Sequence, residues 1–244
     1  MIPNNIKRIC LWSGPRNIST ALMYSFAQRE DTKVFDEPLY AYYLANSKAK
    51  EYHPGADDIL KSQKNNGSDV VATMLNDQSS PILFFKQMTH HFLDGLDKGF
   101  LKQTINIILT RDPKDMIPSF AKVIEKPTID DIGYAKHVEL LNYLKSTDNP
   151  PIVLDSKSVL LNPEKTLRKL CLAIGIPFNL NMLKWKAGSR PEDGVWAKYW
   201  YSNVHKSTSF GAYKPKTDPF PESLIPLLEK CLPYYNQLLQ YNIG

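Results

Sequence analysis

One loop of this chain gathers residue types that can hold an anion. It spans residues 13–20, directly after a short apolar run, and contains Arg16, Ser19 and Thr20. An arginine supplies a permanent positive charge, and hydroxyls in a first helical turn lie beside backbone N–H groups that no helix carbonyl uses. The loop therefore indicates a phosphate or sulfate site. The alternative is that its Gly-Pro step only makes a turn and the hydroxyls only cap the helix.

The same loop differs from the P-loop of nucleoside-triphosphate enzymes. Counting from Gly14, the second glycine position of the motif G-x-x-x-x-G-K-[ST] holds Ser19, and the lysine position holds Thr20. The missing lysine argues against an ATP-dependent kinase. A kinase of atypical sequence stays an alternative, because both kinds of enzyme would use an anion site between a strand and a helix.

A second candidate anion site follows another apolar run, residues 104–110. Arg111 comes at the end of that run, and Ser119 lies eight residues later in a predicted helix. Asp112 as N-cap and Pro113 as first helical residue give that helix a well-defined start. A phosphate is well held by the donor fork of an arginine together with a hydroxyl near a helix N-terminus. An arginine before Asp-Pro is also typical of a surface ion pair, so this feature alone is not decisive.

The elements that must position these loops follow from hydrophobic periodicity. Short apolar runs rich in Ile, Leu and Phe predict strands buried on both faces, and periods of 3.6 residues predict the helices between them. Such alternation indicates an α/β fold with a largely parallel sheet, in which ligands bind beyond the carboxyl ends of the strands. The predicted strands are residues 7–12, 33–35, 81–86, 104–110 and 152–154; the predicted helices are 18–29, one from 113, 129–145, and 163–174 closed by Gly175; residues 40–78 have only weak helical periodicity.

Composition limits the class of protein. With 244 residues and 43% hydrophobic content, we expect one domain, 1–244, in a soluble chain without a membrane span or secretory signal. The net charge of +5 is scattered, which disfavours nucleic acid and suits a small polyanionic ligand. Three widely spaced cysteines in apolar settings predict buried free thiols and a cytoplasmic location; they are Cys10, Cys171 and Cys231.

The two loops together resemble the sites of the sulfotransferase family. Its 5′-phosphosulfate loop commonly reads Gly-x-Pro-[Arg/Lys]-Ser-Gly-[Ser/Thr]-Thr. Most positions of the present loop match it or nearly so, and its Ser-Gly pair is replaced: the matches are Gly14, Pro15, Arg16, Ser19 and Thr20, and the replacements are Asn17 and Ile18. Over nearly its full length the chain is similar to bacterial sulfotransferase-like proteins and to part of the plant proteins named branched-chain aminotransferase-like, without a recognisable pyridoxal-phosphate fingerprint.

The resemblance implies a fold and a reaction. The fold is a P-loop NTPase-like three-layer sandwich with a central, mostly parallel sheet flanked by helices. The reaction moves a sulfuryl group from 3′-phosphoadenosine 5′-phosphosulfate to a hydroxyl or amine of a small metabolite by in-line displacement, without a metal. The loop 14–20 would hold the 5′-phosphosulfate, with Arg16 neutralising the leaving phosphate, and Arg111 and Ser119 would hold the 3′-phosphate.

The aromatic segment of residues 185–213 resembles the family's C-terminal lid in position and composition. It combines three tryptophans and several tyrosines with basic and hydroxyl residues. Because it lacks the Arg-Lys-Gly signature of cytosolic members, the expected donor contacts rest on composition. They are Lys206, Ser207 and Thr208.

Two groups could take the proton of the acceptor. Glu37 follows the second predicted strand, and we favour it slightly. His90 or His91 with Lys86 resembles the Lys-Thr-His arrangement of cytosolic sulfotransferases, although two extra residues intervene. Glu37 could instead be a polar strand end, and adjacent histidines are often packing residues. A domain that binds a nucleotide or a partner without turnover therefore also stays open, and the oligomeric state is not predicted.

Overall fold

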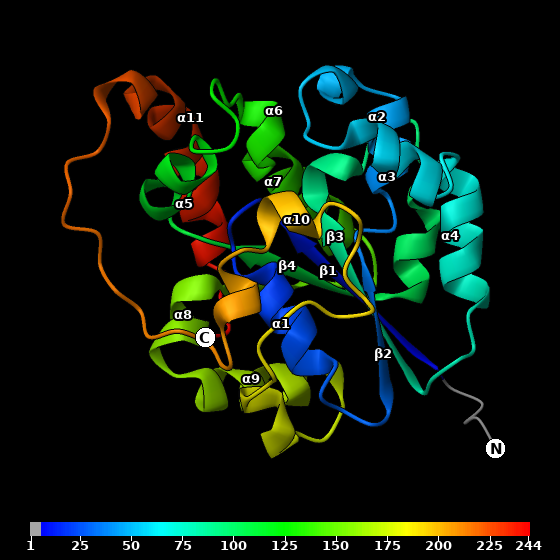
Figure 1. Ribbon diagram of the computed structural model, residues 1–244. Helices are drawn as coiled ribbons and strands as arrows, with labels where there is room; N and C mark the ends of the chain where they lie inside the picture. Colours follow the sequence, from blue (N-terminus) through cyan, green and yellow to red (C-terminus); the bar gives the residue numbers. More distant parts are fainter. Residues whose placement is uncertain (1–5) are drawn as a thin grey trace.

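Five parallel strands form a single sheet at the centre of the molecule (Figure 1). The computed structural model describes residues 6–244. The strand order is β2-β3-β1-β4-β5, and every neighbouring pair is parallel. This confirms the predicted sheet. The strands are β1 (Lys7–Ser13), β2 (Thr32–Asp36), β3 (Ile82–Met88), β4 (Ile105–Thr110) and β5 (Ile152–Asp155).

Alternate side chains of each strand enter different cores. On β1, Cys10 and Trp12 pack on one face, and Ile9 and Leu11 pack on the other. One layer is α1 (Ser19–Phe26), α8 (Ser156–Leu161) and α9 (Pro163–Ile174). The opposite layer contains α4 (Gly67–Asn76), α5 (Pro113–Phe120), α6 (Ile129–Ile132), α7 (Tyr134–Lys145) and α11 (Ile225–Leu239).

Further short helices lie at the edge of the sheet and on its loops. A third apolar cluster joins α2, α3 and α10 near the carboxyl ends of the strands. These are α2 (Tyr40–Ala45), α3 (Ala56–Ser62) and α10 (Ala197–Trp200), and the 3₁₀ turns are η1 (Lys48–Glu51), η2 (Thr89–His91), η3 (Lys98–Gln103), η4 (Leu180–Leu183), η5 (Val204–Lys206) and η6 (Glu222–Leu224).

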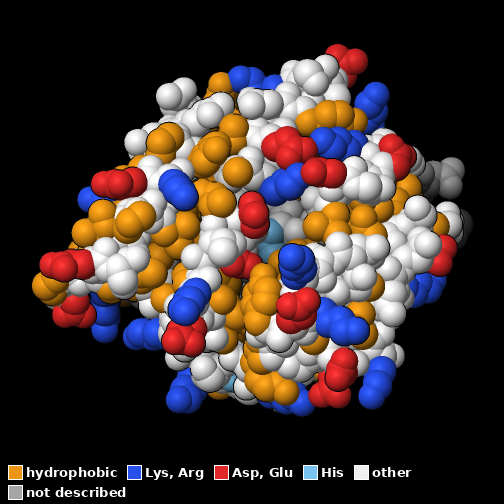
Figure 2. Space-filling view, turned by 90° about the horizontal axis from the view of Figure 1, so that it is seen from above, with side chains coloured by type: hydrophobic (Ala, Val, Ile, Leu, Met, Phe, Trp, Pro, Cys, Tyr) orange, Lys and Arg blue, Asp and Glu red, His pale blue; other side chains and the backbone are white. Residues whose placement is uncertain are grey.

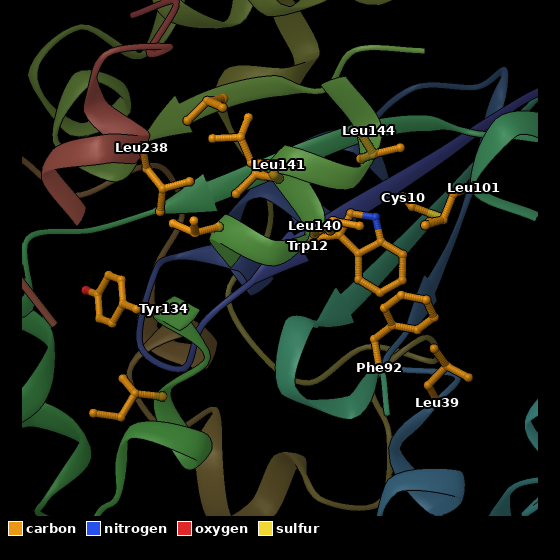
Figure 3. Packing of buried hydrophobic residues seen from close by; sticks show 14 of the residues in the cluster. Cys10, Trp12, Leu39, Phe92, Leu101, Tyr134, Leu140, Leu141, Leu144 and Leu238 are labelled. Carbon is orange, nitrogen blue, oxygen red and sulfur yellow. The ribbon is translucent and has the colours of Figure 1, made fainter. Parts of the chain in front are cut away.

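Trp12 shows how the larger core is built (Figure 3). Its ring is fully buried against Phe92, 5.5 Å between centroids, and its Nε1 donates a hydrogen bond to Asn106 Oδ1 at 2.9 Å. A buried tryptophan needs such a partner for its N–H. The core therefore fixes β1 against β4 by packing and by a specific polar contact.

Several local predictions are confirmed. Asp112 caps α5 by accepting a hydrogen bond from the backbone N–H of Lys114, Pro163 opens α9, and Gly175 ends it at φ 68°. The cysteines are buried free thiols. None of the helices in residues 6–244 is long and apolar enough to cross a membrane.

Two helix predictions need correction. The helix predicted over residues 129–145 is divided into α6 and α7 at Gly133, which has φ 79°. A residue in this left-handed conformation ends a helix. The hydrophobic periodicity of the sequence continues from α6 into α7, so it did not show where the first helix ends. The helix predicted from residue 18 begins at Ser19 and ends at Phe26, with Ile18 itself at φ 61°.

Candidate active site

A cavity of about 480 Å³ lies beyond the carboxyl ends of the strands. In the face seen in Figure 2, histidine is visible at the bottom of a hollow. The loop after β1, the ends of β2, β3 and β4, and the C-terminal segment all contribute to its wall. The cavity is thus at the place where parallel sheets bind ligands.

Most of the residues selected from the sequence come together at this cavity. Gly14, Lys206 and Thr208 do not line it. The lining residues are Pro15, Arg16, Asn17, Ile18, Ser19, Thr20, Glu37, Lys86, His90, His91, Arg111, Ser119 and Ser207.

The loop after β1 is fixed by close backbone contacts. A Cβ on Gly14 would lie 2.8 Å from the carbonyl oxygen of Ile132, so only glycine fits there. Asn17 is buried, and its Nδ2 donates to the carbonyl of Leu109 on β4 at 3.2 Å. These two contacts hold the loop between β4 and α6 before α1 begins.

Backbone strain is concentrated at the cavity. Within residues 6–244, the non-glycine residues with positive φ are Arg16 at 58°, Ile18 at 61° and Glu37 at 43°, and all three line the cavity. Such conformations cost about 1–3 kcal/mol each and cluster at functional sites. Ile18 thus adopts a conformation that glycine takes without this cost.

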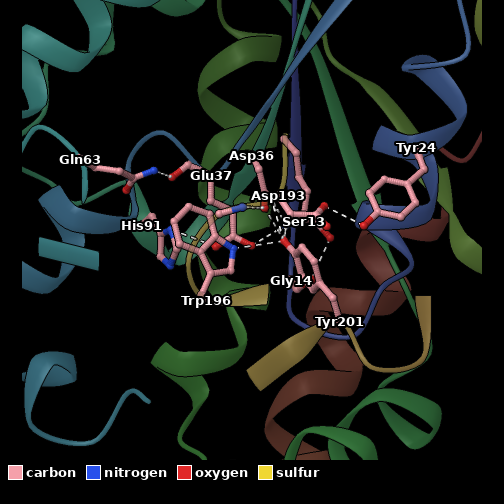
Figure 4. Close-up of polar contacts among 12 residues, drawn as sticks. Ser13, Gly14, Tyr24, Asp36, Glu37, Gln63, His91, Asp193, Trp196 and Tyr201 are labelled. Atoms are coloured by element: carbon pink, nitrogen blue, oxygen red, sulfur yellow. Dashed lines mark hydrogen bonds and ion pairs between the residues drawn. The ribbon is translucent and has the colours of Figure 1, made fainter. Parts of the chain in front are cut away.

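Hydrogen bonds on both sides of Glu37 maintain its unusual backbone. Its N–H donates to the carbonyl of Lys86 at 2.8 Å, and its own carbonyl accepts from Gln63 Nε2 at 3.1 Å (Figure 4). The carbonyl also accepts from the N–H of Tyr40 at 3.0 Å. The backbone of Glu37 is therefore held by β3, by the start of α2 and by Gln63, the residue after α3.

Two arginines meet where the two loops converge. Arg111 Nη1 donates to the carbonyl of Arg16 at 2.8 Å, and Arg16 Nε donates to Ser119 Oγ at 3.1 Å. Arg16 Nη1 also donates to the carbonyl of Trp200 at 3.2 Å. Neither guanidinium forms an ion pair with a carboxylate of the described chain, and burial together with the charge of Arg111 lowers the pKa of Arg16. An anion bound here would relieve that unbalanced charge.

Lys86 is at the centre of a buried polar quartet with Asp36, Glu37 and Tyr201. Its Nζ contacts Asp36 Oδ1 at 2.8 Å, Glu37 Oε1 at 2.5 Å and the Tyr201 hydroxyl at 2.6 Å. An ammonium has three N–H donors, so all of them are used. Burial alone would lower the pKa of Lys86, but the two carboxylates raise it. Lys86 is therefore a charged residue with no donor left for a ligand.

Glu37 differs from an ordinary carboxylate in its environment. Burial raises its pKa to about 7; Lys86 opposes this effect and Asp36 adds to it. Its second oxygen, Oε2, is 3.9 Å from His91 Nδ1, which is too long for a hydrogen bond. Glu37 therefore lines the cavity with a carboxyl group that can change protonation near neutral pH.

The adjacent histidines are neutral packing groups. Burial lowers the pKa of His90 to about 3 and that of His91 well below 6.5. The His91 ring is stacked between Tyr40 and Tyr43, with centroid distances of 4.5 and 4.7 Å. Both imidazoles are thus weak bases in the free protein.

The C-terminal segment closes one side of the cavity and is anchored to α1. Tyr24 donates to Asp193 Oδ1 at 2.7 Å, and His205 Nε2 is 2.9 Å from Asp193 Oδ2. Ser207 Oγ lines the cavity, but it accepts from Trp185 Nε1 at 3.1 Å and donates to the carbonyl of Val204. Ser207 thus has partners within the segment itself.

Sequence reasoning missed Asp36, Tyr40, His53, Trp200 and Tyr201 as residues of the site. In the sequence, Asp36 is recognisable only as part of a polar strand end. Trp200 and Tyr201 are recognisable only as members of an aromatic C-terminal segment. The acidic Asp-Glu pair at the end of a strand opposite a strand with a buried lysine could have been a signal, because a buried lysine requires a counter-charge. Among residues 6–244, no three His, Cys, Asp or Glu side chains are grouped as a metal site would require.

Comparison with known proteins gives consistent results. A family model described as "Sulfotransferase domain" matches residues 7–241. The branched-chain-amino-acid aminotransferase-like protein 1 of Arabidopsis thaliana is 43% identical over 229 residues, 93% of this chain but only 40% of that protein. The chain thus spans about two fifths of the length of such relatives.

Solved structures show the same fold. A sulfotransferase domain from the curacin biosynthetic pathway has a TM-score of 0.60 at 17% identity, covering 99% of this chain and all of that one. A sulfotransferase domain from the Synechococcus PCC 7002 olefin synthase has a TM-score of 0.55 at 16% identity, covering 94% and 97%. The P-loop-like sandwich predicted from the sequence is therefore confirmed.

Proposed function

Because the chain belongs to the sulfotransferase domain family, we propose that it transfers a sulfuryl group from 3′-phosphoadenosine 5′-phosphosulfate to a hydroxyl or amine of a small acceptor. The observation that carries this proposal is the pair Arg16 and Arg111. They come from two different strand ends, meet at one cavity, and lack a carboxylate partner in the described chain. Two uncompensated guanidinium groups suit a ligand with separate anionic groups.

In this proposal, the loop after β1 binds the 5′ end of the donor. The first turn of α1 offers backbone N–H groups and the hydroxyls of Ser19 and Thr20, and Arg16 balances the charge that grows on the leaving phosphate. Arg111 and Ser119 bind the 3′-phosphate. The contact between Arg16 and Ser119, 3.1 Å, supports the view that both anion sites belong to one ligand.

Glu37 is the proposed base. The acceptor oxygen forms a bond to sulfur as the bond between sulfur and the phosphate oxygen breaks, and the acceptor proton goes to Glu37 Oε2. A base works best when its pKa is near the working pH, and the pKa of Glu37 is about 7, whereas that of His90 is about 3. Lys86 has no free donor, so we assign it the role of positioning Glu37 rather than contacting the sulfuryl group.

Thermal unfolding with added ligands tests this function directly. At 100 times its dissociation constant, a ligand of the native state stabilises it by about 2.7 kcal/mol. Adenosine 3′,5′-bisphosphate should therefore raise the unfolding temperature without metal, and ATP with Mg²⁺ should have little effect. A stabilisation by ATP and Mg²⁺ alone would instead favour a kinase. Binding of the bisphosphate without transfer to any hydroxylated compound in a mass-spectrometric screen would indicate a binding domain without turnover.

A further inference from the structure

One end of the cavity has a distinct chemical character. It is formed by Glu37, Tyr40, His53, His90 and His91, and Trp200 marks its border with Arg16, whose Nη1 donates to the Trp200 carbonyl at 3.2 Å. The rings contact one another: His91 stacks on Tyr40 and lies against His90, and His53 lies against Tyr40 and Trp200. If the proposed function holds, this end is left for the acceptor, and its walls are mainly aromatic faces.

The formal charge at this end is not positive, although a lysine lies there. Lys86 is matched by both Asp36 and Glu37, with contacts of 2.8 and 2.5 Å, so the three groups sum to −1 when Glu37 is ionised and to zero when it is protonated. The lysine side chain is only 1% exposed. A ligand therefore finds neither a net positive charge nor a free ammonium donor there.

The histidines do not add positive charge to this end of the cavity. His90 and His91 are buried and, like His53, have a pKa lowered by burial, to about 3 for His90 and about 4 for His53. Asp131, which is buried behind them and paired with Tyr52, adds a further carboxylate on that side. The imidazoles thus offer neutral ring surface, and the charges beside them are Lys86, the two carboxylates that it contacts, and Asp131.

We propose that the acceptor is an uncharged hydroxy compound with a flat apolar body, and that this end of the cavity rejects acceptors carrying a carboxylate or phosphate. The inference rests on the proposed function, because it assigns this end to the acceptor. An anion would lose its hydration without gaining a counter-charge, which is unfavourable in a buried site. The neutral body would pack on Tyr40, His53 and Trp200, and its hydroxyl would meet Glu37 Oε2.

Two probes with the same phenol ring and similar size test the proposal: 2-(4-hydroxyphenyl)ethanol, which ends in a neutral alcohol, and 4-hydroxyphenylacetate, which ends in a carboxylate. Their dissociation constants are measured by calorimetry with saturating adenosine 3′,5′-bisphosphate, so that Arg16 and Arg111 are occupied. We expect the neutral probe to bind at least roughly tenfold more tightly. Equal affinity, tighter binding of the anion, or failure of both probes to bind would overturn the proposal.

A variant separates charge from shape. Measured above pH 7, where Glu37 is mostly ionised, Glu37→Gln removes one negative charge at nearly constant volume, so the anion should bind roughly five to tenfold more tightly, while the neutral probe changes by less than about twofold. Glu164→Gln, on the exposed surface of α9, is the matched control and should change neither. If the anion gains nothing in the Glu37 variant, charge does not select the acceptor.

The same measurements distinguish failure of this inference from failure of the proposed function. Lack of bisphosphate binding would remove the proposed function. If the bisphosphate binds but the anion gains no affinity from Glu37→Gln, the donor site stands and only the charge inference is overturned.

Discussion

The hydroxyl of Tyr201 donates a hydrogen bond to the carboxylate of Asp36, 165 positions earlier in the sequence, at 2.8 Å from Oδ2. Asp36 ends β2, whereas Tyr201 belongs to the C-terminal segment that closes the cavity. The same carboxylate accepts from Lys86 and from the backbone N–H of Gly194. The position of the C-terminal segment is thus linked through Asp36 and Lys86 to the environment of Glu37.

Tyr201→Phe should lower the stability of the protein and raise the pKa of the proposed base. The change leaves a buried Lys86 donor and an Asp36 oxygen without their partner, which should cost about 1–3 kcal/mol of unfolding free energy. Tyr201 also holds Lys86, whose charge lowers the pKa of Glu37, so its loss should move the rise of the pH–rate profile to higher pH. Denaturant unfolding and the pH dependence of turnover measure the two effects.

Tyr199→Phe is the control, since Tyr199 lies two residues away and is 40% exposed. It should leave both quantities unchanged. If the Tyr201 variant lost stability while its pH profile stayed in place, Tyr201 would support the fold but would not influence Glu37.

Turnover should rise with pH through about 7 in the native protein. The carboxylate form of Glu37 is the proposed base, and burial raises its pKa from 4.5 to about 7. Glu37→Gln should lower turnover by about 10²–10⁴-fold, and the residual rate should no longer rise in this range. His91→Phe, which keeps a ring between Tyr40 and Tyr43, should retain most of the turnover. The opposite ranking of the two variants would identify the histidine as the base.

The free energy of unfolding should also depend on the ionisation of Glu37, between pH 4.5 and about 7. Its folded pKa, about 7, lies above the value of 4.5 expected when unfolded, so the unfolded chain releases the proton first as the pH rises. The contribution of Glu37 to stability is therefore complete below pH 4.5 and is lost as the pH rises to about 7. The difference in unfolding free energy between the native protein and Glu37→Gln should fall over this interval. A constant difference would show that the carboxyl group has an ordinary pKa.

The sequence predicted the sheet well because strands buried on both faces are nearly continuous apolar runs. It also placed Arg16 and Arg111 beside the starts of two helices, since α1 begins at Ser19 and Asp112, which caps α5, adjoins Arg111. Local signals of this kind need no knowledge of distant contacts. The fold and these two loops were therefore accessible from the sequence.

What the sequence did not predict depends on contacts between distant segments. The quartet joins Asp36, Lys86 and Tyr201 from three separate elements, and no periodicity marks such a meeting. Lys86 was consequently interpreted as a catalytic lysine, although two carboxylates satisfy it. The stacking of His91 on Tyr40 was equally hidden, because residues 40–78 have little periodic pattern.

Arg111→Ala should separate the two phosphates of the donor. An arginine that holds the 3′-phosphate contributes roughly 1.5–3 kcal/mol through charged hydrogen bonds, which corresponds to roughly 10- to 150-fold in affinity for adenosine 3′,5′-bisphosphate. Adenosine 5′-phosphate, which lacks that group, should lose less than about threefold. Calorimetry of both ligands checks this, with the exposed Arg168→Ala as control. Equal losses for both ligands would mean that Arg111 acts by holding the carbonyl of Arg16.

Gly14→Ala should disturb the loop after β1 through a single methyl group. Its Cβ would lie 2.8 Å from the carbonyl oxygen of Ile132, and a backbone atom cannot move away as a flexible side chain can. We expect a loss of about 1–3 kcal/mol in unfolding free energy and weaker bisphosphate binding. Gly95→Ala is the matched control, because its Cβ would meet only the Tyr42 hydroxyl at 3.9 Å. Full bisphosphate affinity in a destabilised Gly14 variant would show that the loop geometry set by this contact is not needed for the anion, and that Arg16 binds it without help from the backbone.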